Sequence, residues 1–115
     1  MDVRASLNNY RISASKARLV VDQVRGKGVE DALNLLSVSN KGFSRPLSKL
    51  LQSAVANAED KNNTHNACID IDRLVISKIA VDEAPGNWRI RARAQGRASW
   101  IQKRTSHISV VLSER

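Results

Sequence analysis

The stretch Trp88–Arg104, WRIRARAQGRASWIQKR, carries six basic residues and no carboxylate. It contains both tryptophans of the chain and has no apolar run long enough to build a core. Both of its flanks have extended character, and the chain can fold back near residues 93–96. The simplest fold for this stretch is one long antiparallel hairpin, which leaves the rest of the protein near Asp82 and returns near Thr105.

Such a hairpin lacks the means to hold itself together. Each of its two sides has about a dozen residues and could reach ~35–40 Å at ~3.4 Å per residue. An isolated two-stranded hairpin is marginal in water, and this one has few apolar cross-strand pairs and many like charges. We expect its base to be held by the rest of the domain and its tip to become ordered on a partner.

Apolar periodicity predicts a small domain around the hairpin. Strands are expected at residues 3–7, 73–81 and 106–112, and a polar loop is expected at residues 60–66. The first helix should start at Ser13 or Ser15 and stop at Gly26, and the second should span residues 29–38. Pro46 limits the third helix to a start at Ser44 or to a looser first turn from Lys41, and its apolar spacing continues to Ala58.

This order of elements predicts the α+β class. We expect three helices packed on a small three-stranded antiparallel sheet, with a long protruding β-hairpin. The length of 115 residues suits one domain, and the scarcity of aromatic residues predicts an aliphatic core.

The charge of the chain is large and unevenly placed. Residues 1–27 carry six bases and two acids, residues 28–83 carry six and eight, and residues 84–115 carry seven and one. These counts give the net charge of +8, and no Asp or Glu occurs from Ala84 to Ser113. A directed cationic surface favours nucleic acid as the partner. Arg outnumbers Lys five to one in the quoted stretch, and Arg can bond phosphate bidentately and stack on bases.

Two further features bear on this partner. A turn near residue 94 would place Trp88 and Trp100 roughly opposite each other. They could then pack across the hairpin or stack on unpaired bases, and both could hold at once. Four bases lie off the apolar stripe of the first helix: Lys16, Arg18, Arg25 and Lys27. Alone they are typical of a solvated helix face, but beside an acid-free hairpin they favour a second surface that contacts phosphates.

No catalytic, metal or cofactor site is evident in the sequence. Cys68 is the single cysteine, and His65 and His107 do not have the spacing of metal ligands. A paired-carboxylate site is a weak alternative, with candidates Glu59, Asp60, Asp70 and Asp72. No stretch resembles a signal peptide or a transmembrane span. We therefore expect no enzyme and no bound cofactor.

Four blocks of the chain resemble the family of the bacterial large-subunit ribosomal protein L-twenty-two. They are SASKARLVVDQVRGK (Ser13–Lys27), LLQSAVANAE (Leu50–Glu59), KIAVDEAP (Lys78–Pro85) and RARAQGRASWIQKRTSHISVV (Arg91–Val111). The resemblance runs from about Tyr10 to the end of the chain, and KRTSHI after the basic stretch is its most specific part.

The resemblance implies a structural constituent of the large ribosomal subunit, located in the cytoplasm, that binds large-subunit ribosomal RNA and acts early in subunit assembly. It implies a globular part near the mouth of the peptide exit tunnel and a hairpin that runs inward to line the tunnel wall. The implied partners are ribosomal RNA, neighbouring ribosomal proteins at the tunnel, and the nascent peptide near the tip. Neither a membrane nor a homo-oligomer is expected.

From the residues and the resemblance together we predict that residues 82–104 form an extended RNA-binding hairpin of a single domain, residues 1–115. The predicted RNA-binding set is Arg4, Arg11, Lys16, Arg18, Arg25, Lys27, Trp88, Arg89, Arg91, Arg93, Gln95, Arg97, Trp100, Lys103, Arg104, Thr105 and His107. The residues alone leave three other functions open, namely a free DNA-binding protein, a nuclease that uses the carboxylates, and a membrane-active cationic hairpin.

Overall fold

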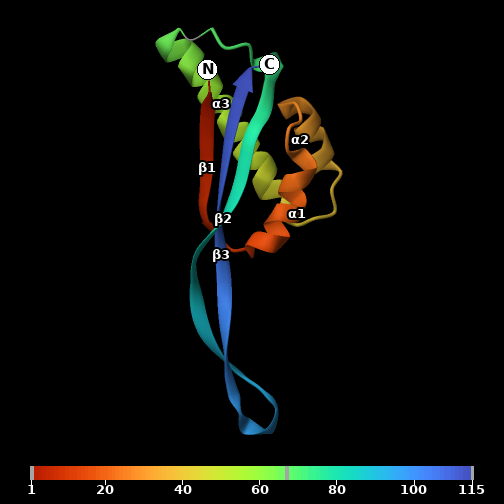
Figure 1. Ribbon diagram of the computed structural model, residues 1–115, viewed down its shortest axis with the longest axis vertical. Coiled ribbons are helices and arrows are strands. Elements are labelled where there is room, and N and C mark those ends of the chain that lie inside the picture. Colours follow the sequence, from red (N-terminus) through yellow and green to blue (C-terminus); the bar gives the residue numbers. More distant parts are fainter. Residues whose placement is uncertain (1, 67, 115) are drawn as a thin grey trace.

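The computed structural model describes residues 2–66 and 68–114, and its elements follow the predicted order (Figure 1). The class is α+β, as predicted. The elements are β1 (Val3–Tyr10), α1 (Ala14–Val24), α2 (Val29–Ser37), α3 (Ser44–His65), β2 (Leu74–Ala92) and β3 (Ala98–Glu114), with 3₁₀ turns at Ile71–Arg73 and Ala94–Gly96. The predicted strands and the predicted hairpin are continuous, because β2 and β3 run without a break from the sheet into the hairpin.

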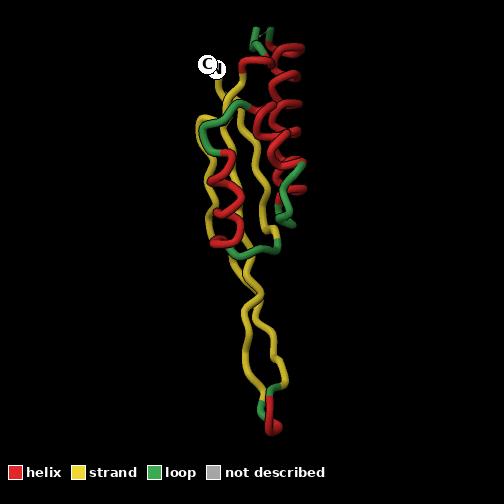
Figure 2. Tube along the Cα trace, turned by 90° about the vertical axis from the view of Figure 1, so that its right-hand side faces the viewer, coloured by secondary structure: helices red, strands yellow, loops and turns green. Residues whose placement is uncertain are grey.

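The three strands form one antiparallel sheet in the order β1-β3-β2. Helix α3 packs on β1, α1 packs on β2, and α2 packs on α3. Seen from the side, the helices accompany only the upper part of the strands, and the hairpin below them has no covering layer (Figure 2).

The core is aliphatic, as predicted, and it lies between the helices and the sheet. Leu47, Leu51, Ile76 and Ile108 are among its largest fully buried side chains. Phe43 adds one buried aromatic ring, and the centroid of the Tyr10 ring lies 5.7 Å from the centroid of the Phe43 ring.

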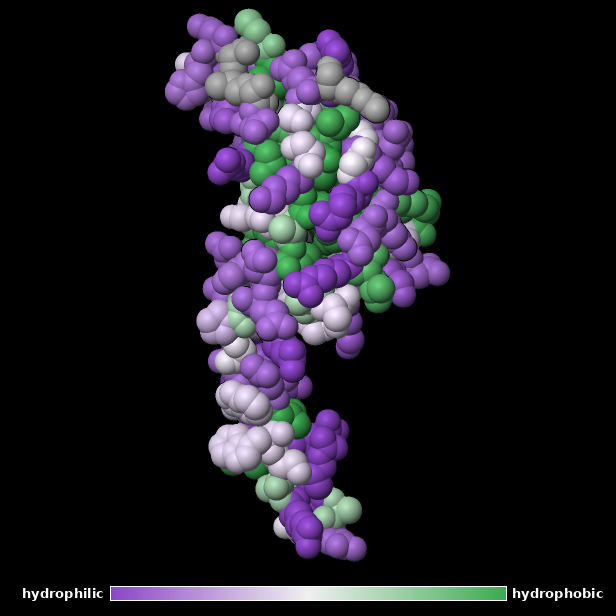
Figure 3. Space-filling view, in the orientation of Figure 1, coloured by the Kyte–Doolittle hydropathy of each residue, from purple (hydrophilic) through white to green (hydrophobic). Residues whose placement is uncertain are grey.

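The core ends where the hairpin leaves the sheet. No residue between Val81 and Thr105 is buried, and we call residues 82–104 the arm. The arm stretches the molecule to 64 Å and gives a radius of gyration of 17.4 Å, against about 13 Å for a compact chain of this length. Figure 3 shows the apolar side chains gathered in the globular part and mostly hydrophilic ones along the arm.

Helix α3 corrects two of the predicted boundaries. The expected polar loop at residues 60–66 is mostly helix, because α3 continues to His65 and ends at Asn66 in the left-handed conformation (φ 50°). The Asn62 side chain links the last turn of α3 to the segment that follows it, through two hydrogen bonds with the backbone of Ile69 at 2.6 and 2.8 Å. Ser44 does not cap the helix, since its hydroxyl donates to the Lys41 carbonyl in a turn that leads into α3.

Two β-bulges set the register of the long strands. One lies between Ile76 and Lys78, and the other lies between Ala84 and Asn87 at the start of the arm. Beyond the second bulge, Trp88 pairs with Gln102 and Ile90 pairs with Trp100. The expectation that the two tryptophans would lie opposite each other is therefore wrong, because the strands fold back around residue 95 rather than 94. The tryptophans are diagonal neighbours on one face of the ribbon.

Three consecutive residues of β3 brace the base of the arm. The Thr105 hydroxyl donates to the Pro85 carbonyl inside the second bulge (2.8 Å), and the buried Ser106 hydroxyl donates to the Ile12 carbonyl (2.7 Å). His107 Nδ1 accepts a hydrogen bond from the Asn9 amide (3.1 Å), where the pairing of β1 with β3 is also irregular. These bonds satisfy backbone groups that the regular ladder leaves unpaired.

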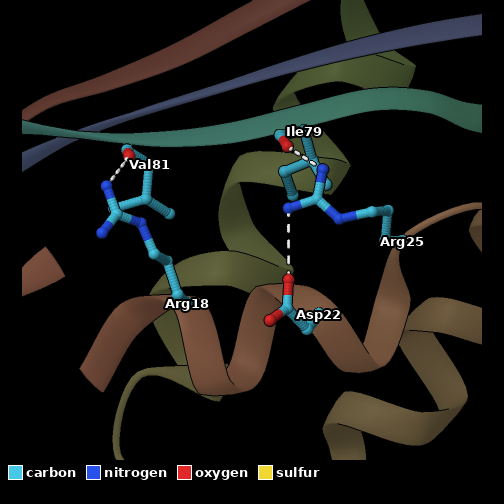
Figure 4. A network of polar contacts seen from close by, with 5 residues as sticks. All are labelled: Arg18, Asp22, Arg25, Ile79 and Val81. Carbon is cyan, nitrogen blue, oxygen red and sulfur yellow. Dashed lines mark hydrogen bonds and ion pairs between the residues drawn. The ribbon is translucent and has the colours of Figure 1, made fainter. Parts of the chain in front are cut away.

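Helix α1 closes the outer edge of β2 with arginine side chains (Figure 4). The Arg18 guanidinium donates to the Val81 carbonyl (2.9 Å), and the Arg25 guanidinium donates to the Ile79 carbonyl (2.5 Å) and pairs with Asp22 (3.2 Å). Because β2 is an edge strand, these carbonyls point away from the sheet and would otherwise be open to another strand.

We expect Leu51→Ala to lower the free energy of unfolding by about 2–5 kcal/mol, because the lost side chain is fully buried and leaves a cavity. Leu19→Ala is the matched control, since Leu19 is 61% exposed on α1, and it should change stability by less than about 0.5 kcal/mol. Urea denaturation followed by circular dichroism measures both, and equal losses would contradict the assigned core.

We expect Arg18→Ala to lower the free energy of unfolding by about 1 kcal/mol, since it removes a hydrogen bond to Val81 and packed side-chain stem. Lys16→Ala on the same helix should leave stability within about 0.5 kcal/mol, because Lys16 is exposed. If both variants unfold at the same urea concentration as the parent, Arg18 does not close the β2 edge.

Candidate nucleic-acid interface

The cations of the arm are free to meet a partner. Among the described residues, four of these cations make no side-chain hydrogen bond or ion pair: Arg91, Arg93, Arg97 and Lys103. The Arg89 guanidinium bonds only the neighbouring Trp88 carbonyl (3.1 Å), and Arg104 lies 3.8 Å from Glu83 in an exposed ion pair. An exposed pair of this kind contributes little to stability, so the arm keeps its positive charge available.

The register of the arm limits the expected repulsion between like charges to its tip. Arg89 lies opposite Ile101, Arg91 lies opposite Ser99, and Lys103 lies opposite Asn87. Arg93 and Arg97 lie opposite each other at the last pair before the turn, where the Arg93 amide donates to the Arg97 carbonyl (2.6 Å), so the costly arrangement of like charges face to face is confined to the tip.

A cationic groove lies where the arm meets the globular part. We call it the junction groove, and its volume is about 520 Å³. It is lined by Arg11, Ile12, Ser13, Lys16, Asn87, Arg89, Gln102, Lys103 and Arg104. Five of these nine residues are basic and none is acidic, so the groove suits an anionic group. The tertiary fold creates this site, because its cations come from three separate segments of the chain.

The start of α1 adds to the positive potential of the junction groove. Ser13, one of the two predicted candidates, occupies the N-cap position, but its side chain makes no capping hydrogen bond. The amide groups of the first turn therefore lack a side-chain acceptor, and the positive end of the helix dipole lies beside Lys16. Together with the five cations, this arrangement favours phosphate.

Several predicted RNA-binding residues have internal partners instead. Arg18 and Arg25 bond carbonyls of β2, while Thr105 and His107 brace the base of the arm. The structure gives these four side chains a role in the fold, and their contact with RNA stays a prediction.

The remaining predicted residues are spread over the molecule. Arg4 pairs with Val111 on β3 and lines a surface pocket over the sheet with Lys78, and Lys27 follows the C-terminal end of α1. Gln95 lies at the tip of the arm in the left-handed conformation (φ 63°), and it is exposed. These residues do not line the junction groove.

Sequence reasoning missed three polar residues of the groove and one cation elsewhere. Ser13, Asn87 and Gln102 line the junction groove, and Lys78 lies beside Arg4. Asn87 and Gln102 carry no local signal, since their position depends on the bulge at Pro85–Gly86. Lys78 could have been found from its alternation with the buried Ile79 in a predicted strand.

Other chemistry has little support in the described part of the chain. Residues 2–66 and 68–114 contain no group of three or more His, Cys, Asp or Glu side chains placed to hold a metal ion. The Asp70 carboxylate accepts a hydrogen bond from the Asp72 amide (3.1 Å) and so caps a 3₁₀ turn. No helix in these ranges has the length and apolarity needed to cross a membrane.

Comparison with known families agrees with this geometry and with the resemblance noted in the sequence. The sequence model of the family described as Ribosomal protein L22p/L17e matches residues 5–113, which is nearly the whole chain. Proteins of this family are structural and non-enzymatic, and they bind RNA as parts of the ribosome in the cytoplasm. The chain therefore belongs to the Ribosomal protein L22p/L17e family and is a constituent of the large ribosomal subunit.

Proposed function

We propose that this protein binds large-subunit ribosomal RNA through two connected surfaces, the junction groove and the arm. The observation that carries the proposal is the continuity of positive charge between them. Arg89, Lys103 and Arg104 belong to both surfaces, and no carboxylate occurs in the sequence from Ala84 to Ser113. RNA supplies negative charge along an extended path, which matches a cationic ribbon better than a single small anion does.

The two surfaces have different tasks in this proposal. The junction groove is held by the braced base of the arm and by α1, so it can receive a phosphate with little rearrangement. The arm has no buried residue and becomes rigid as it threads among phosphates. Each phosphate contact releases counterions, so binding should weaken steeply as salt rises.

The proposal extends to the place of the protein in the subunit. The globular part lies near the mouth of the peptide exit tunnel, beside neighbouring ribosomal proteins, and the arm runs inward until its tip meets the tunnel wall and the nascent peptide. The 64 Å length of the molecule supports such a reach. Because the arm and the RNA would order each other, binding belongs to an early stage of subunit assembly.

We expect replacement of Arg91, Arg93 and Arg97 by Ala to weaken binding to large-subunit ribosomal RNA without changing the melting temperature. All three side chains are exposed and lie outside the core, so their loss removes phosphate contacts alone. The slope of log K against log salt should become shallower by about 2–3 units, and sucrose gradients should show less protein in large subunits.

The charge-matched control replaces Lys41, Lys49 and Lys61 by Ala, three bases of the globular part outside the predicted set. It should keep most of the affinity, because the proposal assigns binding to the arm and groove rather than to net charge. Equal loss in both triple variants would contradict a directed surface, and a collapse of melting in the arm variant would place the arm in the core.

A further inference from the structure

The arm has two chemically different faces. Side chains alternate along a strand, so the register assigns each residue to one side of the ribbon. One face carries Trp88, Ile90, Ala92, Ala98, Trp100 and Gln102. The other face carries Asn87, Arg89, Arg91, Ser99, Ile101 and Lys103. We call the first the aromatic face and the second the cationic face.

The aromatic face exposes large apolar side chains to solvent. Trp88 is 57% exposed, Ile90 is 64% exposed and Trp100 is 66% exposed, and together they account for three of the five large exposed apolar residues described. The view in Figure 3 shows paler residues along the left side of the arm and strongly hydrophilic ones along its right side. Exposed apolar groups gathered in this way are typical of an interaction site.

The two tryptophan rings do not cover each other from solvent. They are diagonal neighbours, and their rings do not form an aromatic pair; among the described residues, Tyr10 and Phe43 form one. The sequence allows two interpretations of Trp88 and Trp100, packing against each other or stacking on a partner. The register and the exposure of both rings favour stacking on a partner.

The charge of the arm selects the chemistry of that partner. The cationic face and the acid-free sequence require negative charge nearby, while the aromatic face requires flat apolar surfaces. Unpaired RNA offers both, since its phosphates are anionic and every base has a π face. A lipid surface is a poorer match, because it would meet one face of the ribbon and leave the other in water.

We propose that Trp88 and Trp100 stack on unpaired bases of RNA while Arg89, Arg91 and Lys103 on the opposite face bind phosphates. This inference rests on the proposed function and adds which part of the RNA each face meets. The arm would then lie between a phosphate backbone and a segment of RNA whose bases are not paired. Duplex RNA of the same charge would engage the cationic face only.

The fluorescence of the intact protein tests this assignment, because Trp88 and Trp100 are the only tryptophans in the chain. The probes are a single-stranded adenosine oligonucleotide, an RNA duplex with the same number of phosphates, inorganic polyphosphate, and vesicles containing phosphatidylglycerol. We expect strong quenching by the single strand and little change with the duplex or with polyphosphate. Equal quenching by polyphosphate, or a response to vesicles alone, would overturn the inference in favour of charge or lipid binding.

Variants test the energetic contribution of the rings. Replacing both tryptophans by Leu should weaken single-strand binding, measured by anisotropy of labelled RNA, by roughly tenfold per ring. Replacing both by Phe should restore most of the affinity, and Leu19→Ala, another exposed apolar change, should have no effect. The Leu variant should bind the duplex as the parent does, which shows that the arm still forms.

The results separate this inference from the proposed function. If the double Leu variant binds single strands like the parent while binding to ribosomal RNA persists, base stacking is wrong and the proposed function stands. If the parent fails to bind ribosomal RNA at all, the proposed function itself is wrong and the inference falls with it.

Discussion

The structure depends on one constraint, which is that the arm is a two-stranded ribbon with no second layer to pack against. From Asp82 to Arg104 no side chain is buried, so hydrophobic burial does not hold the arm in place. Its stability must come from continuity with the sheet at its base and from a partner along its length. The globular part supplies the support at the base, and the exposed cations of the arm suit the partner.

Hydrogen bonds in the globular part hold the base of the arm. Thr105, Ser106 and His107 bond carbonyl or amide groups at the bulges and at the link before α1, which fixes the direction in which the ribbon leaves the sheet. Arg18 and Arg25 close the outer edge of β2, so that the long strand is protected from pairing with other chains where it is most regular. The basic residues of α1 and its C-cap therefore have two roles. Lys16 lines the junction groove, while Arg18 and Arg25 stabilise the fold.

Much of this could be predicted from the sequence, and the rest failed for identifiable reasons. Helical periodicity and the acid-free stretch were enough to predict the class, the helices and the arm. The internal role of Arg18 was not predictable, because an outward carbonyl of an edge strand leaves no mark in the sequence. The partners of Trp88 depend on a bulge of one residue at Pro85–Gly86, where a side chain on Gly86 would come within 3.0 Å of the Lys103 carbonyl. The junction groove combines separate segments, so no local pattern could reveal it.

Amide hydrogen exchange of the free protein and of its complex with large-subunit ribosomal RNA tests the central claim most directly. The account predicts strong protection in the free protein for the core pairs of β2 and β3, such as Ile79 with Val110, and weak protection beyond the bulge from Asn87 to Lys103. Adding the RNA should raise protection along the arm and leave the core unchanged. Arm amides as protected as the core in the free protein, with no gain on binding, would contradict the claim that a partner makes the arm rigid.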